Sequence, residues 1–388
     1  MSLAPVVALA TIYRTIGLVI MALTFVGVTV YVLINVMASG KPEVGSEIEL
    51  APNRKSYLSD EELEGRKLDK ALTWGLGTLF VIGLGLPLYW VMEPGREKNE
   101  AEHFNTKFVA EGRKLFETTA NEGLNCAGCH GGMNAPGGAA PYTLLKPDGS
   151  FDRQVNWRAP ALNTVLLRYS REEVTYILTY GRPFSPMPAW GIAGNGPLND
   201  QQIQNLVDYL ESIQISADES QQQVEVELRK VLGLAEDAEI DYDDPAVGEA
   251  LFNLGLEDGF AGGAYACGRC HSQEWSYTNS IDELEAPGCG ALGPSLCGKS
   301  EEDQFPANSN PAEGESVLQA QIDFITQGSE NGKRYGEHGQ GSGRMPGFGQ
   351  RPAEKALYWI AGGKDRPASG GMLNEDMIKA IVEYERSL

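Results

Sequence analysis

The sequence has little cysteine, little histidine and little positive charge. Its 388 residues include 6 cysteines and 4 histidines, and 31 Lys and Arg stand against 53 Asp and Glu, a formal net charge of −22. The shortage of basic residues argues against a nucleic-acid partner, because phosphates are neutralised by clustered Lys and Arg. Four of the six cysteines fall in two Cys-x-x-Cys-His runs, which is not the pattern of a disulfide scaffold.

Two stretches near the N-terminus lack charge altogether. One lies between Arg14 and Lys41 and the other between Lys70 and Glu93, and about 20 apolar residues suffice to cross a bilayer as a helix. The first run is longer than the apolar core of a cleaved signal peptide, the alternative interpretation. The Lys- and Arg-rich loop between the two stretches belongs in the cytoplasm by the positive-inside rule. We therefore expect a first transmembrane helix at 1–40, a cytoplasmic loop or amphipathic helix at 41–70 and a second transmembrane helix at 71–93.

The two cysteine-histidine runs have the spacing of a covalent haem c attachment site. They are Cys126-Ala-Gly-Cys129-His130 and Cys267-Gly-Arg-Cys270-His271. In such a site the two thiols add to the haem vinyl groups, and the histidine lies beneath the iron. Zinc needs four ligands, and the first motif has no further cysteine nearby; a redox dithiol would not need the histidine. The sequence predicts two covalently bound haem c groups, with His130 and His271 as iron ligands.

A haem iron that only carries electrons needs a sixth ligand, and methionine opposite histidine raises the reduction potential. Met187 and Met345 each lie well downstream of a haem motif and each precede a proline, which fixes φ and helps to hold the loop. We expect both sulfurs to bind iron. His103 and His338 are the alternative ligands.

The same order of elements occurs twice along the chain. An amphipathic helix precedes each haem motif, and a helix opened by Asn follows each candidate methionine, at Leu198–Ile213 and at Leu373–Leu388. This internal duplication predicts one domain at 105–214, a linker at 215–243 and a second domain at 244–388.

Both domains resemble the class I cytochrome c family. The second contains Gly293-Pro-Ser-Leu-Cys-Gly298, which matches the family's proline-bearing segment, and the first has a looser match at Ala159-Pro-Ala-Leu162. The resemblance implies that the carbonyls of Pro160 and Pro294 accept hydrogen bonds from the proximal histidines and fix the orientation of the rings. The expected fold is all-α, with two N-terminal transmembrane helices followed by two tandem class I cytochrome c domains.

The whole arrangement also resembles membrane-anchored di-haem subunits of respiratory complexes. It implies a carrier of single electrons on the extracytoplasmic, periplasmic side of a bacterial plasma membrane, anchored as a multi-pass protein and not an enzyme on its own. The first expectation is the cytochrome c subunit of a quinol:cytochrome c reductase (bc-type) complex, or of its supercomplex with an oxidase. The alternatives are the di-haem electron-entry subunit of a cbb-type oxidase, a stand-alone tethered cytochrome and a di-haem peroxidase. Expected partners are integral-membrane subunits (a b-type cytochrome and Rieske protein, or a haem-copper oxidase) and a redox partner that is a cytochrome or copper protein.

Cys289 and Cys297 lie outside the haem motifs, in a loop rich in Gly and Pro. In an oxidising compartment a disulfide between them is plausible, and two free buried thiols are the alternative.

Overall fold

The computed structural model describes most of the chain beyond residue 64. The described residues are scattered positions between 19 and 37, then 65–183, 185–306, 318–330, 332–350, 354–355, 365–366 and 369–388. The chain divides into two compact units, Met1–Phe104 and Asn105–Leu388. Helix α3 (Arg66–Phe116) crosses the boundary between them. Within the second unit we call 105–214 the first half and 244–388 the second half.

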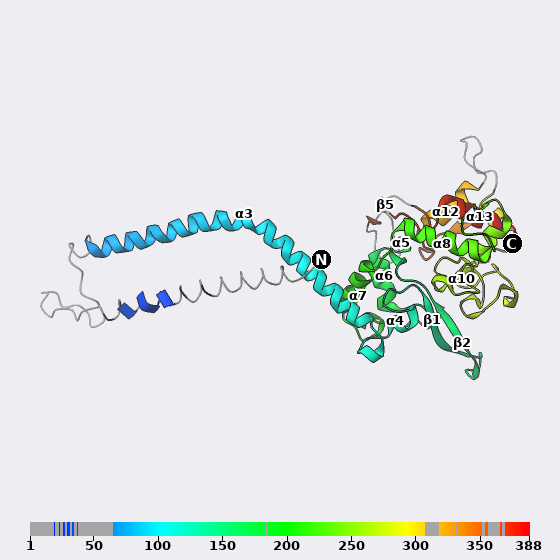
Figure 1. Cartoon of the computed structure of the whole chain (residues 1–388), viewed down its shortest axis with the longest axis horizontal. Coiled ribbons are helices and arrows are strands. Elements are labelled where there is room, and N and C mark those ends of the chain that lie inside the picture. The colour runs from blue at the N-terminus through cyan, green and yellow to red at the C-terminus, as the bar shows by residue number, and fades with distance from the viewer. Residues whose placement is uncertain are drawn as a thin grey trace. The chain divides into compact units, whose positions relative to one another are not determined.

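In the N-terminal unit, α3 forms a single long helix (Figure 1). Its stretch Arg66–Trp90 is long and apolar enough to cross a membrane, and none of its most apolar window is buried within the protein. Large apolar side chains stay exposed along it, among them Leu76, Phe80 and Trp90. An apolar surface of this extent is unfavourable in water, so composition and exposure both suit a lipid environment.

The expectation of two N-terminal transmembrane helices is wrong. Over the described residues, one helix is long and apolar enough to span a membrane, and it lies in α3. Most of the predicted first span (1–40) and the predicted loop up to residue 64 lie outside the described residues. The expectation relied on the two uncharged stretches of the sequence. Such a stretch is a property of composition, and composition alone does not determine whether a membrane-spanning helix forms.

The second unit consists of short helices joined by long loops and small two-stranded sheets. The elements that follow α3 in the first half and up to residue 243 are η1 (Thr119–Asn121), α4 (Cys126–His130), β1 (Gly138–Leu145), β2 (Phe151–Ala159), α5 (Val165–Arg168), α6 (Arg171–Tyr180), η2 (Ile192–Gly194), α7 (Asp200–Ser212) and α8 (Ala217–Val231). Those of the second half are α9 (Pro245–Phe252), η3 (Phe260–Gly263), α10 (Gly268–His271), η4 (Trp275–Tyr277), η5 (Ile281–Glu283), α11 (Ser300–Gln304), α12 (Gln319–Gln327), β3 (Arg334–Tyr335), β4 (Gly339–Gln340), β5 (Glu354–Lys355), β6 (Asp365–Arg366) and α13 (Glu375–Glu385).

In the first half, the end of α3 crosses α7 at a glycine. A Cβ built on Gly112 would lie 2.9 Å from the Cβ of Tyr209 and even closer to the backbone carbonyl of Asn205. One turn later, the rings of Phe116 and Tyr209 meet with centroids 5.2 Å apart. The absence of a side chain at residue 112 therefore lets the two helix backbones approach closely and bury their apolar faces.

In the second half, α9 crosses α13 in the same way. A Cβ on Gly248 would lie 2.8 Å from the Cβ of Tyr384 and even closer to the carbonyl oxygen of Ala380. Four residues after the glycine, Phe252 meets Tyr384 with ring centroids 5.2 Å apart. The repeat seen in the sequence thus extends to the packing, because a Gly four residues before a Phe faces a Tyr at both crossings.

The predicted N-caps of the two terminal helices are confirmed. The side chain of Asn199 accepts from the backbone N–H of Gln202 at 2.9 Å and forms a full capping box with it. The side chain of Asn374 accepts from the backbone N–H of Met377 at 2.9 Å. Both helices therefore begin where the sequence places them, because each Asn satisfies an N–H that has no partner within the helix.

The expected all-α fold is wrong, since small antiparallel sheets are present. Strands β1 and β2 pair from Gly138 with Ala159 to Leu145 with Phe151. Strands β3 and β4 pair with each other, as do β5 and β6. The turn Lys146-Pro-Asp-Gly-Ser150 between the first pair has the composition of a hairpin loop. Apolar and aromatic residues on either side of it form the strands that the expectation of an all-helical fold missed.

The stretch 215–243, predicted as a linker, contains the helix α8. Its side chains Val224 and Leu228 are fully buried in the core of the second half. The hydroxyl groups of Ser220 and Tyr265 form a hydrogen bond of 2.8 Å. This segment is therefore part of the packed unit, which explains why the two halves form one compact unit.

Candidate functional site

The first haem motif forms the short helix α4, and its histidine is buried. Nδ1 of His130 lies 2.8 Å from the carbonyl oxygen of Pro160. A carbonyl can only accept, so Nδ1 carries the proton and donates it, which leaves the lone pair of Nε2 free for a metal. The structure therefore places His130 and Pro160 in the relation that the resemblance implies.

The electrostatics of this site favour a neutral imidazole. Burial lowers the pKa of His130 to about 4; the hydrogen bond to Pro160 opposes the shift, and the positive charge of Arg269 adds to it. A neutral ring is the form that can bind a metal. Burial also raises the pKa of the Cys126 thiol to about 12, and it raises the pKa of Cys129. These are thiols in an apolar setting, unlike the exposed thiolates of a reactive dithiol.

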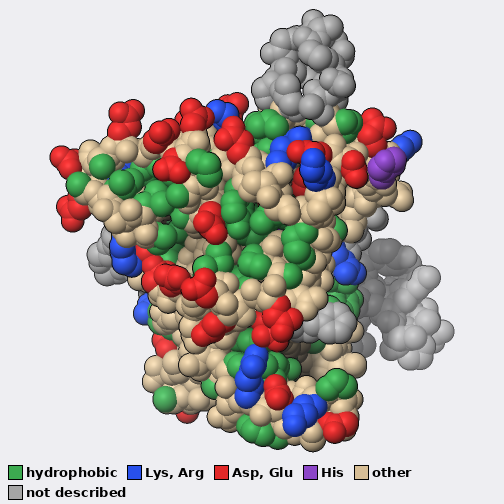
Figure 2. Space-filling model, turned by 90° about the vertical axis from the view of Figure 1, so that its right-hand side faces the viewer, with side chains coloured by type: hydrophobic (Ala, Val, Ile, Leu, Met, Phe, Trp, Pro, Cys, Tyr) green, Lys and Arg blue, Asp and Glu red, His purple; other side chains and the backbone are tan. Residues whose placement is uncertain are grey.

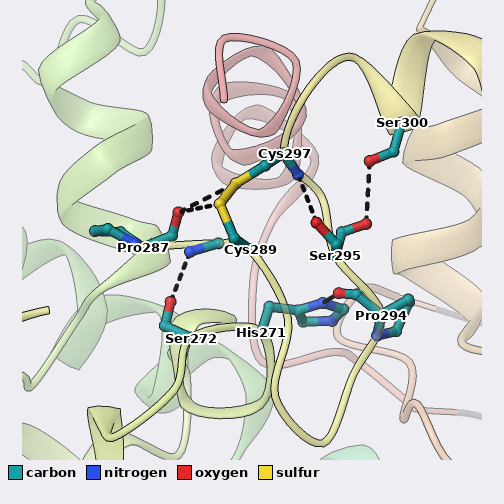
Figure 3. The surroundings of a disulfide bond; sticks show 9 residues. His271, Ser272, Pro287, Cys289, Pro294, Ser295, Cys297 and Ser300 are labelled. Atoms are coloured by element: carbon teal, nitrogen blue, oxygen red, sulfur yellow. Dashed lines mark hydrogen bonds between the residues drawn. A yellow bond between two sulfur atoms is a disulfide. The ribbon is translucent and has the colours of Figure 1, made fainter. Parts of the chain in front are cut away.

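The second haem motif repeats this geometry in α10. Nδ1 of His271 lies 2.9 Å from the carbonyl oxygen of Pro294, and Figure 3 shows the ring directed at that proline. A Cβ on the preceding Gly293 would lie 2.6 Å from Cε1 of the ring. Only glycine fits there, so the loop lies directly against the imidazole. Burial lowers the pKa of His271, and the Pro294 hydrogen bond opposes that shift.

The loop that holds Pro294 is closed by a disulfide. Cys289 and Cys297 are bonded, with Cα atoms 5.0 Å apart. Figure 3 shows the bond above the imidazole of His271, on the same loop as Pro294. Hydrogen bonds fasten one end of this loop to the motif, because the N–H of Gly290 donates to the carbonyl of His271 at 2.8 Å. The disulfide thus restricts the segment that orients the histidine.

The two methionine loops are held by matching hydrogen bonds. In the first half, the N–H of Arg182 donates to the carbonyl of Met187 at 3.0 Å, and the N–H of Trp190 donates to that of Leu178 at 2.9 Å. Immediately before this loop, α6 ends at Gly181 with φ +74°. A Cβ there would lie 2.8 Å from the Met187 carbonyl oxygen.

The second methionine loop repeats each of these features. The N–H of Ser329 donates to the carbonyl of Met345 at 3.0 Å, and the N–H of Phe348 donates to that of Ile325 at 3.0 Å. Here α12 ends at Gly328 with φ +79°. The two loops therefore share one backbone scaffold, although a hairpin of β3 and β4 is inserted in the second.

Each methionine packs against the hydrophobic cluster that also includes or contacts a haem-motif cysteine of its own half. Met187 and Cys126 pack against one cluster, which includes Phe116 and Leu206. Met345 packs against the other, which contains Cys267. Of the alternative ligands, His103 is exposed on α3 in the N-terminal unit, and His338 is exposed between β3 and β4.

A zinc site has little support in the described part of the chain. No group of three or more His, Cys, Asp and Glu side chains there has the arrangement to hold a metal ion. Cys289 and Cys297, which a zinc site at the second motif would need, are joined to each other. In contrast, each motif offers two thiols, a buried histidine with a free Nε2 and a nearby apolar cluster. These features fit a covalently held haem at both positions.

Three arginines form a junction between the halves that sequence reasoning did not predict. Buried Arg158 of β2 donates to the carbonyls of Leu256, Trp275 and Thr278. Buried Arg168 of α5 donates to the carbonyl of Ala264 at 2.7 Å. Arg269, inside the second haem motif, donates in the opposite direction to the carbonyl of Arg158 and, within its own half, to that of Gly262. Since each of the three arginines donates to a backbone carbonyl about 100 residues away, no local motif reveals the junction.

Residues 109–214 match the family model of cytochrome c. The first half is thus a cytochrome c domain, which implies covalently bound haem c and haem-based electron transfer. No curated protein and no solved structure matches the chain.

The expectation of two tandem class I cytochrome c domains is wrong, because one such domain is found. The second half keeps the helix crossing, the His–Pro contact and the methionine loop. It surrounds them with a disulfide-closed loop and with the inserted hairpin of β3 and β4. These additions distinguish it from the first half.

Proposed function

We propose that the chain is a carrier of single electrons that holds two haem c groups. The first is attached at Cys126 and Cys129, within the cytochrome c domain, and the second at Cys267 and Cys270. The observation that carries this proposal is the repeated histidine geometry. Both rings are buried, and each donates Nδ1–H to a proline carbonyl, at 2.8 and 2.9 Å. Nε2 is then left as the metal-binding nitrogen at both positions.

In this proposal each haem supplies an iron that alternates between the ferric and ferrous states by one electron. The protein's residues hold the group and exclude water. Pro160 and Pro294 fix the two imidazoles, and Met187 and Met345 are the residues that would hold the iron from their loops. With both positions filled by protein, an iron cannot bind oxygen or peroxide, so the chain transfers electrons and is not an enzyme on its own.

We propose further that α3 anchors the haem-bearing unit in a bacterial plasma membrane. The exposed apolar surface of Arg66–Trp90 supports an anchor. Covalent haem attachment and a disulfide both belong to an oxidising compartment, which supports a location of residues 105–388 on the extracytoplasmic side. The resemblance to di-haem subunits favours a bc-type complex, with a b-type cytochrome and a Rieske protein as partners.

Acidic side chains are spread over the face of the protein drawn in Figure 2. They agree with the excess of 53 Asp and Glu over 31 Lys and Arg in the whole chain. Such a surface favours a redox partner with a basic docking face, which it would attract over a distance set by the ionic strength.

Haem counting tests the proposal. Intact mass spectrometry of the purified chain should show the added mass of two haems. The double variants Cys126→Ser/Cys129→Ser and Cys267→Ser/Cys270→Ser should each retain one. A single added haem in the unmodified protein, lost in the first variant and retained in the second, would remove the second site. Purification in mild detergent tests the partners, since b-type haem and a Rieske protein should accompany the chain; copper and a haem-copper core would favour the cbb-type oxidase instead.

A further inference from the structure

The two haem motifs are connected by a short chain of bonds through the junction. The ring of His130 donates to the Pro160 carbonyl at 2.8 Å. The next residue, Ala161, donates its N–H to the carbonyl of Ala261 at 2.8 Å. Gly262 follows, and its carbonyl accepts from the guanidinium of Arg269. Arg269 is covalently next to Cys270, so three hydrogen bonds and the backbone between them lead from one motif to the other.

The backbones at this crossing are in direct contact. Gly262 has φ +55°, and a Cβ on it would lie 3.2 Å from Cα of Pro160 and closer still to the carbonyl group of Ala159. A Cβ on Gly137 would lie 2.5 Å from the backbone nitrogen of Gly262. Side chains are thus excluded from the contact, and the segment that orients His130 cannot shift without moving the segment bound by Arg269.

Arg269 secures the crossing from within the second motif. Its guanidinium donates to Gly262 and, at 3.0 Å, to the carbonyl of Arg158. Two carbonyls on different halves are therefore bound by one planar group, a geometry that an ammonium cannot reproduce. Its positive charge is thereby held at the crossing behind His130. The residue is placed to affect both sites.

We propose that Arg269 is a positioning residue shared by the two haem sites: it clamps the junction behind His130 and raises the reduction potential of the first haem from within the second motif. The sign follows from charge. Reduction adds one electron to ferric iron, and a positive charge nearby stabilises the reduced state relative to the oxidised one. This inference rests on the proposed function, because it requires a haem at each motif.

The test is a redox titration of the full-length protein, with mediators as electron donors and acceptors, on Arg269→Gln and Arg269→Lys. Arg153→Gln is the matched control, because Arg153 is exposed and pairs across the halves with exposed Glu274 at 3.2 Å, and not with the carbonyls that Arg269 binds. We expect Arg269→Gln to shift the equilibrium constant for reduction of the first haem by about tenfold, or about 59 mV, toward the oxidised state. In Arg269→Lys, which keeps the charge, the potential of the first haem should return most of the way to that of the unmodified protein. In Arg153→Gln the potential should not change. A Met187→His background marks which wave belongs to the first haem.

Hydrogen exchange of the peptide that contains the Ala161 amide tests the clamp separately. Exchange should be faster in both Arg269 variants than in the control, because lysine keeps the charge but not the two-carbonyl contact. The proposal is overturned if the potential of the first haem in Arg269→Gln equals that of the unmodified protein. It is also overturned if exchange of the Ala161 amide in Arg269→Lys equals that of the unmodified protein. The second outcome can be measured even if Arg269→Gln does not incorporate haem. Haem content is measured on every sample, so a chain with one haem refutes the proposed function rather than the role of Arg269.

Discussion

The crossing of α9 and α13 makes a quantitative prediction for Gly248→Ala. The added Cβ would lie 2.8 Å from the Cβ of Tyr384 and closer still to the Ala380 carbonyl, whereas carbon atoms pack at about 3.5–4.0 Å. The helices must therefore separate, although Phe252 and Tyr384 hold them together one turn further on. Overpacking of this kind costs about 1–3 kcal/mol. Up to about 1 kcal/mol is offset by the higher helix propensity of Ala.

The net expectation is a loss of about 1–2 kcal/mol in the free energy of unfolding, because the overpacking cost exceeds the propensity gain. At about 2–4 °C per kcal/mol for a unit of this size, Tm should fall by about 2–8 °C. Thermal unfolding is followed by circular dichroism and by Soret absorbance on protein with full haem content. Gly95→Ala is the matched control, since Gly95 lies in α3 with nothing within 4 Å of an added Cβ. A Gly248→Ala protein that melts at or above the temperature of this control would refute the close-approach reasoning.

Three further perturbations test the sites. Met187→His and Met345→His should each lower the potential of one haem by more than about 59 mV and leave the other in place, since methionine ligation raises the potential; a redox titration checks this. Burial raises the pKa of Glu385 from 4.5 to about 8. Its protonated form therefore contributes stability that is fully present below pH 4.5 and is lost as the pH rises through about 8. Thermal unfolding measured across this pH range should show a smaller decline of stability in Glu385→Gln than in the unmodified protein. Cys297→Ser opens a loop with a sequence separation of 8. It should lower the free energy of unfolding, measured with denaturant, by about 2–3 kcal/mol. On heating, the absorbance of the haem proposed at His271 should change before that of the other haem, because the opened loop holds Pro294 against this histidine.

Sequence reasoning reached the local parts of the site. The spacing of the cysteines identified both motifs, and the resemblance pointed to Pro160 and Pro294, whose carbonyls lie 2.8 and 2.9 Å from the histidines. The N-caps at Asn199 and Asn374 were also predicted. The caps involve neighbours in sequence, and the two prolines lie in segments that resemble a family motif, so the pattern of residue types predicts both features.

The contacts between the halves could not be predicted in this way. Arg158 and Arg168 have polar side chains whose partners are backbone carbonyls, and every residue has such a carbonyl. The helix α8 within the predicted linker was not foreseen, because acidic and amide residues dominate its sequence, although Val224 and Leu228 on one face are fully buried. The hairpin of β1 and β2 was missed because the repeat of helices suggested a single fold class.

The burial of arginine at the junction has a cost that the surrounding contacts must meet. Desolvation lowers the pKa of Arg158 and Arg168, and lowers that of Arg269 to about 10, where the charges of Arg168 and Arg182 add to the effect. Such groups are destabilising unless they are hydrogen-bonded, and here each of the three arginines donates to at least one carbonyl of the opposite half. If the two halves separated, the three guanidinium groups would lose these carbonyl acceptors. The buried arginines therefore favour the state in which the halves are in contact. If the proposed second haem is present, this fixed spacing between the two sites keeps the rate of electron transfer between them constant.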